Sequence, residues 1–162
     1  MKILGIDPGL SVTGYGIMLQ EKQQTSIVDC GVLKFSSKDR LEVRIGQFYD
    51  SISQLIKKES VHLIALETPF LGKNAQNFLK LGYLRGILYL LADQHNISIL
   101  EFSPTEIKQA VTGSGAAQKE QVAFVLTRLF RGLEVPHYLD MTDALAVALC
   151  AIWKNPANRL YR

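Results

Sequence analysis

The stretch ILGIDPGLSVTGYGIM, residues 3–18, contains an apolar run that ends on an acid, Asp7. The run is typical of a buried strand, and the Asp-Pro-Gly sequence at its end is typical of a turn. Asp7 therefore has two interpretations. Either it starts the turn, or it is held rigidly at the end of a central strand, where it binds a metal ion or a phosphate group. The second interpretation requires partners elsewhere in the chain.

Two more strands are predicted after this one, at about residues 12–20 and 25–35. Both are rich in β-branched and aromatic residues, and the polar residues between them are typical of a hairpin loop. The three strands together predict an antiparallel meander. Apolar residues then take a helical spacing over residues 41–56, and we expect Ser36 or Ser37 to cap that helix.

Strands and helices alternate in the rest of the chain. We expect strands at 61–67 and 97–102 and helices at about 74–95, 104–112, 117–130 and 140–153. Ser103, Pro104 and Glu106 supply a capping box and a first-turn proline at the start of one of these helices. This order predicts an α/β fold with a five-stranded mixed sheet, in which three antiparallel strands are followed by two parallel ones, and with helices on both faces.

The composition of the 162 residues is that of an ordinary globular protein, with 48% hydrophobic and 20% charged residues and a net charge of +3. We expect one domain over residues 1–156 and a short tail over residues 157–162. No apolar run is long enough to span a membrane, and the first residues do not form an export signal. Cys30 and Cys150 are predicted to be free thiols, so we expect a cytoplasmic protein.

Three further acids are candidate partners of Asp7. Glu67 ends the strand at 61–67 as Asp7 ends the first strand. Asp140 and Asp143 lie three residues apart at the start of the last helix and so share a face. Acids in a first turn also complement the helix dipole, and Asp140 could be an N-cap alone. The rest of that helix is almost entirely apolar, which places its first turn at the edge of the core, where all four acids can converge.

Four clustered carboxylates repel one another and raise each other's pKa unless a cation lies among them. Carboxylate oxygens favour hard ions such as Mg²⁺ or Mn²⁺. Two such ions, one on an attacking water and one on a leaving oxygen, would form the site of a phosphodiester hydrolase.

Four segments carry a family resemblance over nearly the whole chain: GIDPGLSVTGYGI, ALETPFLGKNAQNFLKLGYLRG, SPTEIKQAVTGSGAAQKEQV and DMTDALAVAL. In order and spacing they resemble the RuvC family of Holliday-junction resolvases, which has the ribonuclease H fold. The resemblance implies that Asp7, Glu67, Asp140 and Asp143 bind the metal ions. It also implies a homodimeric, Mg²⁺-dependent endonuclease that cuts two opposed strands of a four-way junction in DNA recombination and repair. The implied partners are the branch-migration proteins RuvA and RuvB.

Two lysines flank the glycine-bearing loop TGSGAAQK. A cation at a helix N-terminus, as expected for Lys119, opposes the helix dipole unless an anion binds there. Lys108 and Lys119 are therefore predicted to bind phosphate, Lys119 at the scissile group, and the family has functionally important lysines at both positions. Phe70 either packs on the sheet or, as the resemblance suggests, stacks on a base unpaired at the junction centre. His137 lies close enough in sequence to Asp140 to reach the metal site.

Gly82 and Gly86 lie four residues apart on one face of the helix predicted at 74–95. A glycine in a helix costs about 0.5–1 kcal/mol against alanine unless a close approach needs it. That approach is either packing within the monomer or a two-fold homodimer interface, and a dimer suits two opposed cuts. Cations on or near this helix are expected to lead DNA arms toward each site: Lys73, Lys80 and Arg85.

Two other functions stay open on the sequence alone. A strand that ends on an acid and is followed by a glycine-bearing hairpin also opens the actin and sugar-kinase superfamily, in which the loop binds ATP phosphates. That fold needs a second phosphate motif, and none is found in this chain. A non-catalytic nucleic-acid-binding module with the same fold would lack the four carboxylates.

Overall fold

The structure is a computed structural model that describes residues 1–69, 75–134 and 139–154. Within these ranges the strands are β1 (Lys2–Asp7), β2 (Val12–Glu21), β3 (Gln24–Lys34), β4 (Leu63–Glu67) and β5 (Ser98–Phe102). The helices are α1 (Leu41–Glu59), α2 (Ala75–His95), α3 (Pro104–Thr112), α4 (Lys119–Leu129) and α5 (Leu139–Lys154). None of the described helices combines the length and the apolar character needed to cross a membrane.

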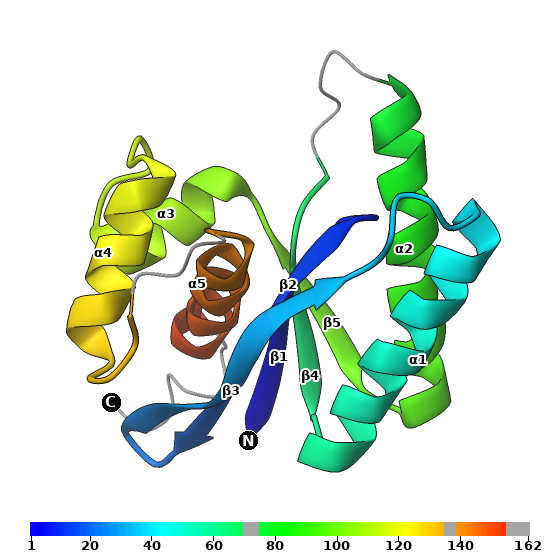
Figure 1. The fold of residues 1–162 in the computed structure, drawn as a ribbon. Helices are drawn as coiled ribbons and strands as arrows, with labels where there is room; N and C mark the ends of the chain where they lie inside the picture. The colour runs from blue at the N-terminus through cyan, green and yellow to red at the C-terminus, as the bar shows by residue number, and fades with distance from the viewer. Residues whose placement is uncertain (70–74, 135–138, 155–162) are drawn as a thin grey trace.

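The strands form one mixed sheet in the order β3-β2-β1-β4-β5. β1 pairs with β2, and β2 with β3, in antiparallel fashion, whereas β1 with β4 and β4 with β5 are parallel pairs. α1 and α2 cover one face of the sheet, and α3, α4 and α5 lie on the other (Figure 1). The fold class predicted from the sequence is confirmed.

Alternation along the two central strands decides which side chains meet α5. In β1, Leu4 belongs to the core shared with α1 and α2, whereas Ile3 belongs to the core shared with α5. In β4, Ala65 belongs to the α5 core as well. Successive side chains of a strand point to opposite faces of the sheet. Asp7 and Glu67, at even spacing from Ile3 and Ala65, therefore fall on the α5 face.

Glycines in β1 and β2 let α5 lie directly on the sheet. A Cβ added to Gly5 would stand 2.0 Å from the carbonyl oxygen of Ala144, and one added to Gly14 would stand 1.9 Å from the carbonyl oxygen of Asp140. Gly14 is also the cross-strand partner of Asp7. Because neither glycine has a side chain, the first turn of α5 has room to pack against the end of β1.

Helix starts agree with the sequence in part. The predicted cap of α1 is wrong, because Ser36 accepts a hydrogen bond from the backbone N–H of Lys38 at 3.2 Å, within a turn that closes before the helix. The N-cap is Arg40, whose side chain makes no capping hydrogen bond. α4 starts at Lys119, two residues later than expected, and the predicted capping box of α3 is confirmed.

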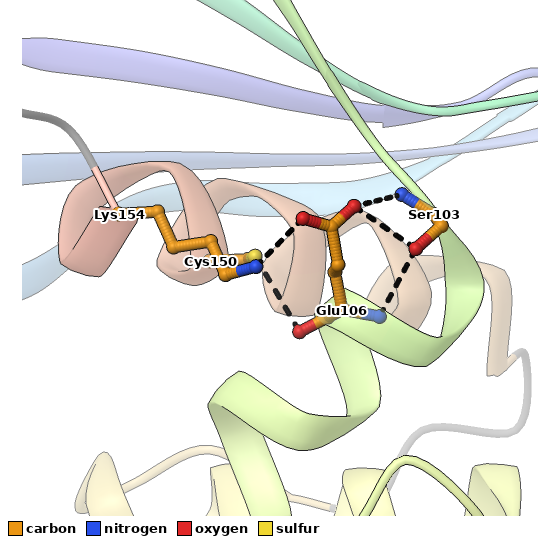
Figure 2. A network of polar contacts seen from close by, with 4 residues as sticks. All are labelled: Ser103, Glu106, Cys150 and Lys154. Atoms are coloured by element: carbon orange, nitrogen blue, oxygen red, sulfur yellow. Dashed lines mark hydrogen bonds and ion pairs between the residues drawn. The ribbon is translucent and has the colours of Figure 1, made fainter.

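A polar network ties the start of α3 to the end of α5 (Figure 2). The side chain of Glu106 accepts hydrogen bonds from Ser103 at the cap and from the Lys154 ammonium at 2.8 Å. The Cys150 thiol lies 3.9 Å from the carbonyl oxygen of Glu106. Cys30 and Cys150 are free, as predicted. The network fixes α3 relative to α5 on the side of the sheet to which Asp7 points.

Candidate functional site

A cavity of about 170 Å³ lies where β1 and β4 end and α3, α4 and α5 approach them. Its polar lining consists of acids from β1, β4 and α5 and of two lysines from α3 and α4. The apolar lining belongs to the core beneath. The lining residues are Ile6, Asp7, Glu67, Pro104, Ile107, Lys108, Lys119, Val122, Asp143, Ala146 and Val147. Three of the four predicted acids and both predicted phosphate-binding lysines therefore share one cavity.

Lys119 is in direct contact with one of the acids. Its ammonium forms an ion pair with the carboxylate of Asp143, whose side chain is 20% exposed. Burial lowers the pKa of Lys119, but the hydrogen bond to Asp143 and the charges of Asp7 and Glu67 outweigh burial and raise it. Lys119 is therefore charged at neutral pH and compensates the acids of the cavity.

The compensation by lysine is incomplete. Burial, and after it the charge of Asp143, raises the pKa of Asp7 to about 7, although Lys119 pulls it down. Burial and the charge of Asp143 also raise the pKa of Glu67. The cavity consequently holds carboxylates that a further positive charge would keep ionised.

Asp140 contributes from the edge of this group. It is not among the residues that line the cavity, but its charge raises the pKa of Asp7. Among the described residues, no three His, Cys, Asp or Glu side chains stand in an arrangement ready to hold one metal ion. The acids are close enough to influence one another's pKa. The Lys119 ammonium lies beside the carboxylate of Asp143.

The other predicted DNA contacts have different environments. Lys108 lines the cavity and lowers the pKa of Glu67. Lys80 is exposed on α2. Phe70, Lys73 and His137 lie outside the described residues, as does the predicted tail at 157–162.

Arg85 differs most from its expected surface role. It is only 9% exposed, and its guanidinium donates a hydrogen bond to the backbone carbonyl of Glu67 at 2.8 Å. It also forms an ion pair with Glu101 on β5. A guanidinium held between two strands is not free to guide DNA, so the expectation for Arg85 is replaced by a role inside the fold.

Gly82 and Gly86 lie on the exposed side of α2. A Cβ added to either glycine would find nothing within 4 Å in the described structure. Among residues 1–69, 75–134 and 139–154, nothing packs against these glycines in the way that the first of the two interpretations, close packing within the monomer, requires.

Sequence reasoning missed two features that shape the site. Gly5 and Gly14 admit α5 to the sheet, and no local sequence signal indicated this, because the contact is with a helix far along the chain. Arg85 supports Glu67 from α2, and it carried no signal that distinguished it from a solvated helix cation.

The chain is similar to known proteins over nearly its whole length. The sequence profile of the family "Crossover junction endodeoxyribonuclease RuvC" matches residues 3–151. The chain belongs to the RuvC family. A RuvC relative from Pelodictyon phaeoclathratiforme is 41% identical over 162 residues, which are 100% of this chain and 85% of the relative. This membership does not favour the actin-like or the non-catalytic alternative.

Solved RuvC structures agree with the fold. Thermus thermophilus RuvC matches with a TM-score of 0.85 and 26% identity, over 94% of each chain. A second structure, described as T. thermophilus RuvC in complex with Holliday junction substrate, has a TM-score of 0.85 and 23% identity, again over 94% of each chain. The ribonuclease H-like sheet with its parallel β1, β4 and β5 is thus the RuvC fold.

Proposed function

We propose that this RuvC-family chain is an endonuclease that cuts four-way DNA junctions at the cavity between β1, β4 and α5. One observation carries the proposal. Acids from three separate elements, Asp7, Glu67 and Asp143, line one cavity together with Lys108 and Lys119. Acids that can hold metal ions, beside lysines that can bind phosphate, suit metal-assisted phosphodiester hydrolysis.

The acids fit a divalent metal by their chemistry. Hard carboxylate oxygens suit Mg²⁺, with Mn²⁺ as a substitute. Burial, followed by the charge of Asp143, raises the pKa of Asp7 to about 7, and a bound cation would favour its ionised form. We propose that Asp7, Glu67, Asp140 and Asp143 hold two ions per site. When bound, these ions activate a water and stabilise the leaving oxygen.

The side chains of the chain itself perform the remaining tasks. Lys119 exchanges its ion pair with Asp143 for the scissile phosphate and offsets the charge that develops there. Lys108 binds the same backbone from α3. Water adds to phosphorus and the 3′ oxygen leaves, which gives 5′-phosphate and 3′-hydroxyl ends. The exposed Lys80 on α2 is a proposed contact to a DNA arm.

Resolution requires cuts in two opposed strands, and we propose that a two-fold homodimer makes them. The outer side of α2 supports this proposal. Gly82 and Gly86 leave open space there, and large apolar side chains on the same helix are exposed: Leu79, Leu81, Tyr83, Tyr89 and Leu90. Glycines permit two helix backbones to approach closely, and an exposed apolar patch is typical of an interface. By family, RuvA and RuvB are the proposed further partners.

Cleavage assays on matched substrates test the proposed function. A synthetic four-way junction and a linear duplex with the same arm sequence are incubated with the protein in Mg²⁺ or EDTA. We expect paired, symmetric nicks in the junction with Mg²⁺, and no cutting of the duplex or in EDTA. Equal cutting of both substrates would indicate a general nuclease, and binding without cutting in any metal would indicate a non-catalytic module.

A further inference from the structure

Arg85 joins three parts of the protein through one buried guanidinium. It projects from α2, and one of its terminal nitrogens donates to the backbone carbonyl of Glu67 at 2.8 Å. The other terminal nitrogen is paired with the carboxylate of Glu101 on β5, which also accepts from the hydroxyl of Tyr89. The side chain of Arg85 is 11% exposed and that of Glu101 is 28% exposed, so the pair is largely removed from water.

Glu67 has a sheet partner on one side of β4 only. The parallel register of β1 and β4 ends at Ile6 and Leu66, one residue before Glu67. On the other side, Glu67 pairs with Phe102, and the next N–H, that of Thr68, donates to the Phe102 carbonyl at 2.8 Å. The hydrogen bond from Arg85 is thus an anchor from the helix layer for the last residue of β4.

We propose that Arg85 is a positioning residue, which holds the main chain of Glu67 so that its carboxylate faces the cavity. The inference rests on the proposed function, because it matters only if Glu67 binds metal. Groups that orient metal ligands set metal affinity without touching the metal, and their loss typically costs about 10–100-fold in affinity or activity.

Arg85 acts on Glu67 through geometry. Burial, followed by the charge of Asp143, raises the pKa of Glu67, and the cations that lower it are Lys119 and Lys108. The guanidinium binds the carbonyl of Glu67 on the α2 side of the strand. The effect of Arg85 is therefore on where the carboxylate lies.

The planar fork of arginine explains the residue type. One end must reach the Glu67 carbonyl while the other stays paired with Glu101. A lysine carries the same charge on a single nitrogen and cannot reproduce two divergent contacts from a rigid plane. Arg85→Lys thus keeps the charge beside Glu101 but loses the two-ended contact.

The test compares metal binding, cleavage and stability in a set of full-length variants. Arg85→Lys retains the charge, whereas Arg85→Met with Glu101→Leu removes both members of the buried pair, so that neither charge is left without a partner. Tyr49→Phe is the matched control, because it removes a 3.0 Å hydrogen bond between α1 and Gln94 on α2 without touching β4.

Each variant is titrated with Mn²⁺ by calorimetry in the absence of DNA. Junction cleavage is then followed against Mg²⁺ concentration, with unfolding midpoints measured in EDTA. We expect Arg85→Lys and the double variant to bind Mn²⁺ about 10–100-fold more weakly and to need correspondingly more Mg²⁺ for half-maximal cleavage. Tyr49→Phe should match the wild type in its Mn²⁺ affinity and in the Mg²⁺ concentration that it needs for half-maximal cleavage. The double variant should bind Mn²⁺ more weakly than the wild type even if the two proteins have the same unfolding midpoint.

The outcomes separate this inference from the proposed function. If the wild type binds Mn²⁺ and cuts junctions, and both Arg85 variants do so at wild-type metal concentrations with only a lower unfolding midpoint, Arg85 is structural and the positioning role is refuted. If the wild type neither binds Mn²⁺ nor cuts junctions, the proposed function is refuted, and the positioning role of Arg85 is refuted as well.

Discussion

Replacement of Asp7 by asparagine should stabilise the metal-free protein. Burial and the charge of Asp143 raise the pKa of Asp7 to about 7, from an ordinary value of 3.8. The ionised carboxylate is therefore unfavourable in the fold and favourable in the unfolded chain. Asparagine has nearly the same shape and carries no charge, so Asp7→Asn removes the conflict.

The size and the pH range of the effect follow from the two pKa values. Between pH 3.8 and 7 the unfolded chain loses the Asp7 proton while the folded chain keeps it, so wild-type stability falls as pH rises through this range. The difference between a pKa of about 7 and one of 3.8 corresponds to at most about 4 kcal/mol. For a chain of this length that is about 8–16 °C in the unfolding midpoint.

Thermal unfolding in EDTA, followed by circular dichroism from pH 4 to pH 8, measures the effect. Asp7→Asn and wild type should unfold at similar temperatures near pH 4, and the variant should unfold at a higher temperature than the wild type at pH 8. Asp50→Asn, the same change at an exposed position on α1, controls for the loss of one charge. An Asp7→Asn protein that is no more stable than wild type at pH 8, or a gain in stability that does not vary with pH, would show that the ionised carboxylate of Asp7 does not destabilise the fold.

Three further perturbations test other parts of the structure. Gly5→Ala places a Cβ against the α5 backbone and should cost at least about 1–3 kcal/mol in denaturant unfolding. Lys119→Met should move the Asp7 pKa further above 7, because Lys119 lowers it, as a carboxyl NMR titration in EDTA would measure. Lys154→Met should lower the unfolding midpoint above pH 4.5, and the loss should fade as pH falls toward the Glu106 pKa of about 2.

Local sequence signals predicted the acids of the site. Asp7 and Glu67 each follow an apolar run, and an acid at the end of a central strand has few structural reasons to be there. Asp140 and Asp143 open a helix whose remaining residues are apolar, which indicated that its first turn lies at the core edge. These inferences needed only the period of each element and the order of the strands.

The supports of the site depended on contacts between distant segments. The glycines in β1 and β2 are required only because α5 crosses there, more than 120 residues later in the chain. Arg85 is buried because Glu101 and the end of β4 lie beneath α2, which helix periodicity alone does not indicate. The predicted cap of α1 was wrong because Ser36 belongs to a separate turn.

Junction cleavage by Asp7→Asn, measured beside junction binding, tests whether the carboxylate of Asp7 is needed for catalysis. A labelled four-way junction is bound in Ca²⁺ and cut in Mg²⁺, by the wild type and by the variant. We expect paired, symmetric nicks by the wild type, and unchanged binding with no detectable cutting by Asp7→Asn. Cutting by Asp7→Asn at the wild-type rate would contradict a metal-binding site built on Asp7, and so would loss of binding together with cutting.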